Sequence, residues 1–306
     1  MRPLRSDEIL GNWATLLLPI NNDDSIDFVR LADEVDALVE YRVSGIYSNG
    51  TAGEFYNQTE DEFDRVSTIL AERCEPAGMP FQLGVSHMSP RISIDRLRRA
   101  VQLRPGAVQV ILPDWSPVSD DEAIAFLSRA ADVANPVGLV LYNPPHAKRV
   151  LSPESVGRLK AAVPALVGVK MLGGDAAWHA AMRRFAHGVS VFVAGHHLAS
   201  EYPLGARGAY SNVACLHPGM AQHWWTMIAA GDPRARTVEN RIRAFMDESI
   251  VPYIRDQGYA PQAVDKFMAA VGAWADIGTR LRWPYRWIPK PEADALRGAM
   301  MSVFAE

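Results

Sequence analysis

Short apolar runs alternate with longer amphipathic segments along the first 231 residues of the 306-residue chain. Short apolar runs are typical of strands buried on both faces, whereas apolar residues spaced three and four apart predict helices. The predicted strands cover residues 13–18, 45–48, 80–85, 108–112, 137–142, 166–171, 189–193 and 209–213. The predicted helices cover residues 25–41, 59–74, 92–103, 120–134, 153–162, 176–186, 198–204 and 219–230.

Eight strand–helix units in this order predict an α/β fold, a (β/α)8 TIM barrel, over residues 1–231. An open sheet that binds a dinucleotide would carry a G-x-G-x-x-G turn after its first strand, and the chain has none there. Beyond residue 231 the strand pattern stops, and the spacing predicts helices over residues 234–257, 262–277 and 292–304. We therefore expect a C-terminal helical extension, residues 232–306, packed on the barrel.

One lysine interrupts a predicted buried strand. Lys170 lies within residues 166–171, which are otherwise apolar. A buried lysine is rare unless it is paired, and burial lowers its pKa toward that of a usable amine nucleophile. The alternative interpretation is a structural ion pair with a carboxylate.

The predicted strand ends bring further polar groups to the same region. Tyr142 ends the strand before that of Lys170, and in barrels of this kind the reactive groups lie at the C-terminal ends of strands. The turn of residues 50–53 follows the second strand, and its free N–H groups and the Thr51 hydroxyl could hold a carboxylate. Taken singly, Tyr142 could be a core tyrosine and the turn an ordinary one, but the three features together predict an active site.

Composition and charge exclude several classes of protein. The chain is 48% hydrophobic and 22% charged with a net charge of −4, so it lacks the basic footprint of a nucleic-acid-binding protein. Two cysteines, Cys74 and Cys215, have no C-x-x-C spacing, which predicts neither a disulfide framework nor a zinc site. No apolar stretch is long enough for a membrane span, and the N-terminus lacks a signal-peptide pattern. We expect a cytoplasmic protein.

The predicted site fits one type of reaction. A neutral lysine amine attacks a 2-keto acid and forms an imine whose protonated nitrogen withdraws electrons. Lowering the lysine pKa to the range needed costs about 4 kcal/mol, which a barrel interior can supply. A nearby phenol transfers protons, and the turn holds the substrate carboxylate. This chemistry needs no metal and no organic cofactor.

Three motifs resemble those of a known family. Gly50-Thr51-Ala52-Gly53-Glu54, Tyr142-Asn143-Pro144-Pro145 and Gly168-Val169-Lys170 are similar, in order and spacing, to the signatures of the dihydrodipicolinate synthase / N-acetylneuraminate lyase family of class I aldolases. The resemblance implies that Lys170 is the Schiff-base lysine, Tyr142 the proton-relaying phenol, and Gly50, Thr51 and Ala52 the carboxylate-binding turn. It also implies that Gly195 and Tyr210 line the pocket, and that the protein forms a homodimer or homotetramer.

The chain departs from the synthase pattern at three positions. Trp115 aligns with a tyrosine that the synthases donate across a subunit interface, Ala52 with a threonine or serine, and Ala147 with the arginine that holds the carboxylate of the aldehyde substrate. Lys148 or Arg149 could replace this arginine after a loop shift. The departures favour imine chemistry with a different second substrate.

The predicted function is therefore that of a lyase, an aldolase or a dehydratase, acting through a lysine Schiff base. The 2-keto acid would be pyruvate, a 2-keto-3-deoxy sugar acid or an aromatic adduct, because His196 and His197 follow Gly195 where lyase members place polar groups, and because Trp115 and Tyr210 give the pocket an aromatic character. The alternative explanation for the two histidines is simple hydrogen bonding at a strand end.

Three other functions stay open. One is 4-hydroxy-tetrahydrodipicolinate synthase of lysine biosynthesis, and another is a catalytically idle relative that only binds a keto acid. The third is a metal-dependent lyase or hydrolase, because five histidines fall near predicted strand ends, although the H-x-H pair of metallo-hydrolase barrels and an H-E-x-x-H motif are missing. These histidines are His87, His146, His196, His197 and His217.

Overall fold

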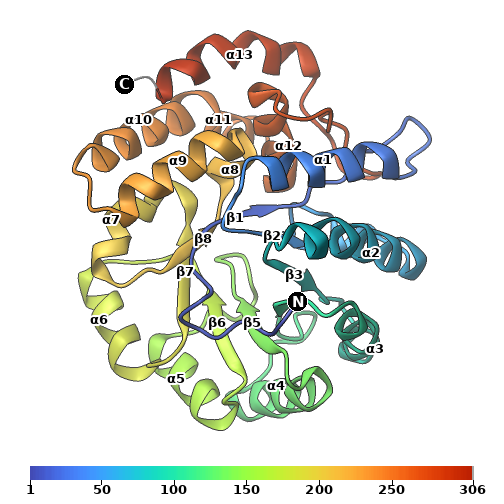
Figure 1. The fold of residues 1–306 in the computed structure, drawn as a ribbon, viewed down its shortest axis with the longest axis vertical. Helices are drawn as coiled ribbons and strands as arrows, with labels where there is room; N and C mark the ends of the chain where they lie inside the picture. Colours follow the sequence, from blue (N-terminus) through green and yellow to red (C-terminus); the bar gives the residue numbers. More distant parts are fainter. Residues whose placement is uncertain (305–306) are drawn as a thin grey trace.

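The computed structural model describes residues 1–304 and contains a closed barrel of eight parallel strands. Each strand pairs with the next along the chain, and the last pairs with the first, with Asn12 opposite Ala209. The predicted (β/α)8 barrel is therefore confirmed (Figure 1). Its strands are β1 (Gly11–Thr15), β2 (Gly45–Ser48), β3 (Phe81–Gly84), β4 (Ala107–Val110), β5 (Gly138–Tyr142), β6 (Leu166–Lys170), β7 (Ser190–Ala194) and β8 (Gly208–Tyr210).

Helices surround the barrel (Figure 1). The helices that follow the strands bury an apolar face against the outside of the sheet, because strand side chains alternate between the interior and these helices. They are α1 (Phe28–Glu40), α2 (Glu60–Ala77), α3 (Pro90–Ala100), α4 (Asp120–Ala134), α5 (Pro153–Ala162), α6 (Ala176–Phe185), α7 (Leu198–Glu201), α8 (Asn212–Leu216) and α9 (Pro218–Ala229).

Aromatic side chains fill the inside of the barrel. Trp13 meets Phe192 edge to face at 6.3 Å between ring centroids, and Tyr47 stacks on Tyr210 at 3.9 Å. Gly45 leaves room for the indole, since a Cβ there would lie 2.6 Å from the Trp13 ring. Each large apolar side chain buried in this way contributes about 1.5–3 kcal/mol, so the interior is a packed core and the strands hold their ends rigidly.

The C-terminal extension packs against one side of the barrel. It contains α10 (Arg234–Ser249), α11 (Val251–Arg255), α12 (Pro261–Gly272) and α13 (Lys290–Val303). Helix α12 packs between α8 and α13, and α10 contacts α7, α9 and α13 (Figure 1). Because α8 follows β8 directly, α12 reaches the C-terminal ends of the strands. The division of the chain after residue 231 stays a prediction.

Several predicted boundaries differ from the structure. The eighth strand ends at Tyr210, not at residue 213, because the Ser211 side chain accepts a hydrogen bond from Ala214 N and starts α8. The helix predicted over residues 234–257 is divided into α10 and α11. Pro252 has no backbone N–H, so the hydrogen bonds between successive turns of α10 cannot continue past it. The first strand is shifted two residues toward the N-terminus, and residues 16–18 are buried outside regular structure.

No helix within the described range is long and apolar enough to cross a bilayer.

Candidate active site

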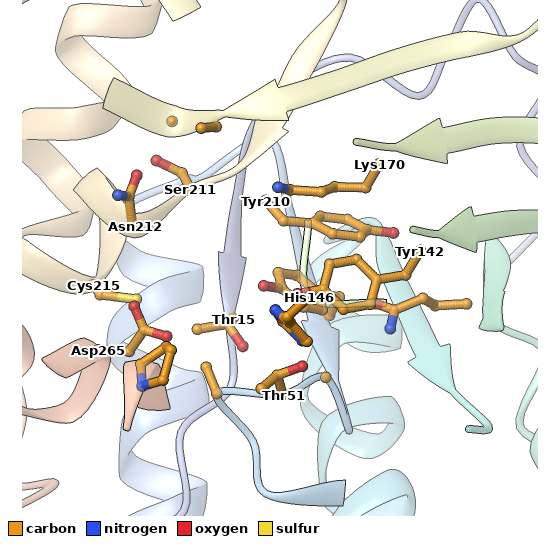
Figure 2. A pocket seen from close by; sticks show the side chains of 17 residues that line it. Thr15, Thr51, Tyr142, His146, Lys170, Tyr210, Ser211, Asn212, Cys215 and Asp265 are labelled. Carbon is orange, nitrogen blue, oxygen red and sulfur yellow. The ribbon is translucent and has the colours of Figure 1, made fainter. Parts of the chain in front are cut away.

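A pocket of about 160 Å³ opens at the C-terminal ends of the strands. Its walls come from every strand except β3, from the turn after β2, from α8 and from α12 (Figure 2). The stacked pair of Tyr47 and Tyr210 contributes to it, and the Tyr210 hydroxyl donates a hydrogen bond to Gln82. The lining residues are Thr15, Tyr47, Gly50, Thr51, Ala52, Gln109, Tyr142, His146, Lys170, Ala194, Gly195, Tyr210, Ser211, Asn212, Cys215, Pro261 and Asp265.

Lys170 is the last residue of β6, and its side chain enters the pocket (Figure 2). Its Cα pairs in register with that of Tyr142, the last residue of β5, and Nζ lies 5.9 Å from the centre of the phenol ring. Burial lowers the pKa of this amine to about 8, against smaller opposing effects of Asp265 and Glu201. About a tenth of the molecules then carry a neutral amine at pH 7, far more than for an ordinary lysine, and the neutral form is the nucleophile.

Tyr142 supplies a phenol that stays protonated. Burial raises its pKa, and a hydrogen bond with the Thr51 side chain partly offsets this rise. Figure 2 shows Thr51 below the tyrosine, on the same side of the pocket. The pair joins the end of β5 to the turn after β2 and can pass a proton between the pocket and the phenol oxygen.

The turn of residues 50–53 presents backbone donors to the same space. Within residues 1–304, the N–H groups of Thr51 and Ala52 make no hydrogen bond, so they can bind an anion. The turn ends at Glu54, whose φ of 49° lies in the left-handed region that a side chain adopts at a cost of about 1–2 kcal/mol. Glu54 accepts a hydrogen bond of 2.7 Å from Lys266 Nζ and one of 3.1 Å from Arg282 N. The C-terminal extension therefore holds the turn in place.

Asp265, on α12, is a pocket residue that the sequence analysis missed. Its carboxyl lies across the pocket from Tyr142, beside Cys215 (Figure 2). Burial raises its pKa to about 7, and the charge of Lys170 opposes that rise. A signal was present in the sequence, because Asp265 and Lys266 are adjacent charges in an otherwise apolar stretch, residues 263–271.

Known proteins resemble this chain over most of its length. Residues 8–299 match the sequence model described as the Dihydrodipicolinate synthetase family. The chain belongs to this family. A 4-hydroxy-tetrahydrodipicolinate synthase from Exiguobacterium is 28% identical over 244 residues, which cover 78% of this chain and 82% of that protein. The predicted family and lyase class are thereby confirmed.

One further relative and one solved structure also resemble this chain. A trans-O-hydroxybenzylidenepyruvate hydratase-aldolase from Sphingobium xenophagum is 27% identical over 178 residues, which cover 56% of this chain and 54% of that protein. A solved structure of a prophage protein of the dihydrodipicolinic acid synthase family from E. coli K12, in complex with pyruvate, has a TM-score of 0.84 at 20% identity. It covers 96% of this chain and 98% of that chain, and this likeness shows the same fold.

Gly195 lines the pocket as predicted for a member of this family, but His196 and His197 are not among the residues that line it. His196 Nδ1 is 2.9 Å from Asn212 Nδ2, and the two imidazole rings lie 4.2 Å apart. Burial lowers the pKa of His196 to about 4, so this ring is neutral at physiological pH. The structure thus places Asn212, and not the histidines, at the pocket surface.

Trp115 lies outside the pocket of its own chain. The residue is 77% exposed, and Lys148 Nζ donates to its carbonyl oxygen at 3.0 Å and sits over its ring. Arg149 donates to Val118 O at 2.6 Å and is paired with Asp120. Neither Lys148 nor Arg149 lines the pocket around Lys170, but Arg149 lines an adjoining cavity of about 210 Å³ that shares Thr51, Tyr142 and His146 with it. A substrate-binding role of Arg149 stays a prediction. A role of Trp115 in a neighbouring subunit stays a prediction.

The five histidines singled out in the sequence do not converge. His146 lines the pocket, whereas His217 caps α9 by accepting a hydrogen bond from Met220 N, and His87 Nδ1 accepts one from Ser89 N. Between residues 1 and 304 no group of three or more His, Cys, Asp or Glu side chains could hold a metal ion.

Proposed function

We propose that this protein is a lyase that binds a 2-keto acid as a Schiff base on Lys170. The observation that carries the proposal is the amine of depressed pKa beside Tyr142, at the ends of two paired strands. Thr51 and the free N–H groups of the turn lie in the same pocket, where they can hold the carboxylate of the keto acid.

The reaction begins with imine formation. The neutral Lys170 amine attacks the keto carbon, a C–N bond forms, and the oxygen leaves as water after taking one proton from the amine nitrogen and one from the Tyr142 phenol. The pair of Tyr142 and Thr51 then recovers a proton from solvent or substrate. The carbon next to the imine carbon then loses a proton, or its bond to the following carbon breaks. The iminium nitrogen accepts the electron pair released in either case.

Two outcomes follow from the resulting enamine. If the enamine attacks an aldehyde, or the reverse reaction takes place, the enzyme is an aldolase. If the substrate loses a hydroxyl group from its carbon chain, the enzyme is a dehydratase. Both use the residues already described and require neither a metal nor an organic cofactor. The hydratase-aldolase relative is consistent with both types of step on one keto acid scaffold.

Deuterium exchange tests the proposal without knowledge of the second substrate. Enamine formation releases a methyl proton of pyruvate, so the wild-type protein in D₂O should remove the pyruvate methyl signal from the proton NMR spectrum. Lys170→Arg should abolish this exchange, because a guanidinium stays charged and cannot form the imine. Pyruvate that binds without exchange would identify the catalytically idle relative and contradict the proposal.

The second substrate is proposed to differ from that of the lysine-pathway synthases. Ala147 cannot bind a carboxylate, and both neighbouring cations already have partners: Lys148 donates to the carbonyl oxygen of Trp115, and the half-buried Arg149 is paired with Asp120. A 2-keto-3-deoxy sugar acid or an aromatic adduct of pyruvate fits these residues better. In a screen of aldehydes with pyruvate, we expect turnover with uncharged aldehydes. Efficient turnover of aspartate semialdehyde would contradict the proposed difference in the second substrate.

We also propose that the enzyme works in the cytoplasm as a homodimer or homotetramer. The support is the family membership, together with the exposed Trp115 at the position where the resemblance implies an intersubunit contact. Sedimentation equilibrium should give two or four chains per particle, and Trp115→Ala should weaken the assembly. A monomer of full activity would contradict this proposal.

A further inference from the structure

Asp265 is the feature of the pocket that the proposed mechanism does not use. It faces the cavity from α12, one helical turn after Pro261, which also lines the pocket, and one turn before Ala269, which packs with Ala52. In Figure 2 its carboxyl lies on the side of Asn212 and Cys215, across from Tyr142. It therefore borders the space left for the part of a substrate beyond the keto acid group.

The carboxyl group of Asp265 has no partner of its own. Within residues 1–304 it makes no hydrogen bond and no ion pair, in contrast to the adjacent Lys266, which binds Glu54 and the carbonyl oxygen of Arg280. Asp265 is half-buried and lines the pocket, so its carboxyl oxygens are open to a ligand that donates hydrogen bonds. Its neighbour Asn212 also has a side-chain oxygen, Oδ1, that is buried without a partner.

The charges of the pocket indicate what that ligand is. Lys170 is the cationic side chain of the described lining, and the protonated imine that it forms keeps this charge at the keto acid end of the substrate. His146 also lines the pocket, but burial lowers its pKa, which favours the neutral ring. Above its pKa of about 7, Asp265 would repel a second carboxylate on the substrate, and the cation of this lining, Lys170, is already engaged with the keto acid end. A hydroxyl group at the same place would instead donate a hydrogen bond to Asp265.

We propose that Asp265 is a specificity-determining residue: it accepts hydrogen bonds from hydroxyl groups on the substrate beyond the keto acid, and it excludes substrates with a second carboxylate there. This inference rests on the proposed Schiff base at Lys170 and adds the substrate class to it. The preferred adduct is a hydroxylated monocarboxylic 2-keto acid. The oxygens of Asp265 and Asn212 together form an acceptor-rich wall that complements such donors.

The test compares keto acids that differ only at the far end. 2-Oxopentanoate and 2-oxoglutarate have the same chain length, and the second carries a terminal carboxylate. The half-saturation concentration for borohydride trapping on Lys170 should be about tenfold or more higher for 2-oxoglutarate in the wild type. Asp265→Asn should remove most of this difference, while Asp276→Asn, a matched change at an exposed carboxylate, should preserve it.

A hydroxylated analogue tests the attractive half of the inference. 5-Hydroxy-2-oxopentanoate should be trapped at an about tenfold lower concentration than 2-oxopentanoate in the wild type, and Asp265→Ala should abolish this preference. Pyruvate serves as the reference within each variant: a change in the pKa of the Lys170 amine caused by the loss of Asp265 affects all keto acids alike and cancels in the ratio to pyruvate. Saturable trapping of pyruvate shows that each variant is folded and still forms the imine.

The possible failures are distinguishable. If no keto acid is trapped by the wild type, the proposed function itself fails, and the inference fails with it. If trapping occurs but Asp265→Asn leaves the ratio between 2-oxoglutarate and 2-oxopentanoate unchanged, the inference alone is overturned. An equal loss for pyruvate, 2-oxopentanoate and 2-oxoglutarate also overturns it, since Asp265 would then act on the keto acid end that all three share.

Discussion

The two sides of the pocket differ in origin and in chemistry. One side comes from the strand ends and the turn after β2, and it offers an amine, a phenol and free backbone N–H groups through Lys170, Tyr142 and Thr51. The other side comes from α8 and from α12 of the C-terminal extension, and it offers oxygen acceptors through Asn212 and Asp265. The first side is suited to an anionic keto acid, and the second to the uncharged remainder of a substrate.

The difference shows how one barrel can keep a reaction and change its substrate. The side with Lys170, Tyr142 and Thr51, called the donor side below, belongs to paired strands and a packed interior, so its geometry follows from the fold. The side with Asn212 and Asp265, called the acceptor side, belongs to helices, where a single substitution changes the charge of the pocket wall. Helix α12 contributes to both sides. Lys266 binds Glu54 at the end of the turn, and the adjacent Asp265 lines the pocket.

The largest expected effect belongs to the amine. Lys170→Ala removes the nucleophile and should lower the rate of pyruvate methyl exchange by about 10³-fold or more. Lys160→Ala is a matched control, because Lys160 Nζ binds the carbonyl oxygen of Leu166 at the opposite end of the same strand. The control should stay within about twofold of the wild type in the same NMR assay. Equal losses in the two variants would mean that Lys170 has only a structural role.

The phenol should rank second. Tyr142→Phe keeps the ring and removes the hydroxyl, so proton transfer slows and kcat should fall by about 10²–10³-fold, with a smaller change in KM. Tyr253→Phe provides the comparison, because its hydroxyl donates to Glu292 within the extension, away from the pocket. Steady-state kinetics should show a fall in kcat for Tyr142→Phe and not for Tyr253→Phe. An unchanged kcat for Tyr142→Phe would mean that the phenol takes no part in the mechanism.

The buried pair that joins the two sides should give an effect on stability as well as on binding. Lys266→Met leaves Glu54 buried without its partner and should lower the free energy of unfolding by about 3–5 kcal/mol. The turn then loses its support, so KM for the keto acid should rise about tenfold. Lys290→Met, at an exposed pair with Asp294, should change the free energy of unfolding by less than about 0.5 kcal/mol in urea titrations.

The smallest effect is a pH shift that both sides determine. The pKa of Lys170 lies at about 8, so the neutral amine, and with it the rate of imine formation, should fall tenfold per pH unit well below that value and level off above it. Asp265 raises the pKa of Lys170, so Asp265→Asn should move this profile to lower pH. Stopped-flow measurement of imine formation reports the midpoint, and a shift to higher pH would contradict the assigned charge interaction.

Much of the fold could be predicted because local patterns determine it. Eight buried apolar runs alternating with amphipathic segments specify a parallel barrel. The helix predicted to start at residue 59 begins there because Thr59 and Glu62 form a capping box at the start of α2. The predicted end of the eighth strand was wrong, because Ser211 and Asn212 start a helix within an apolar stretch whose pattern is also typical of a strand. Periodicity over so few residues cannot separate the two structures.

The donor side of the site was predictable and the acceptor side was not. Lys170 and Tyr142 stand out because each is polar at the end of an apolar run, and the barrel topology then brings them together. Asp265 lies far along the chain in a helix, and its distance from Lys170 depends on how α12 packs on α8, which no local pattern encodes. The same reason explains why His196 was expected at the pocket surface, where Asn212 is found.

The central claim, an imine between Lys170 and a keto acid, is tested most directly by chemical trapping. The wild-type protein is incubated with pyruvate, reduced with borohydride and digested, and the peptides are analysed by mass spectrometry. The account predicts one reduced pyruvate adduct, on the peptide that contains Lys170, and none in Lys170→Ala. The absence of an adduct at every pH between 6 and 9, or an adduct on another lysine, would contradict it.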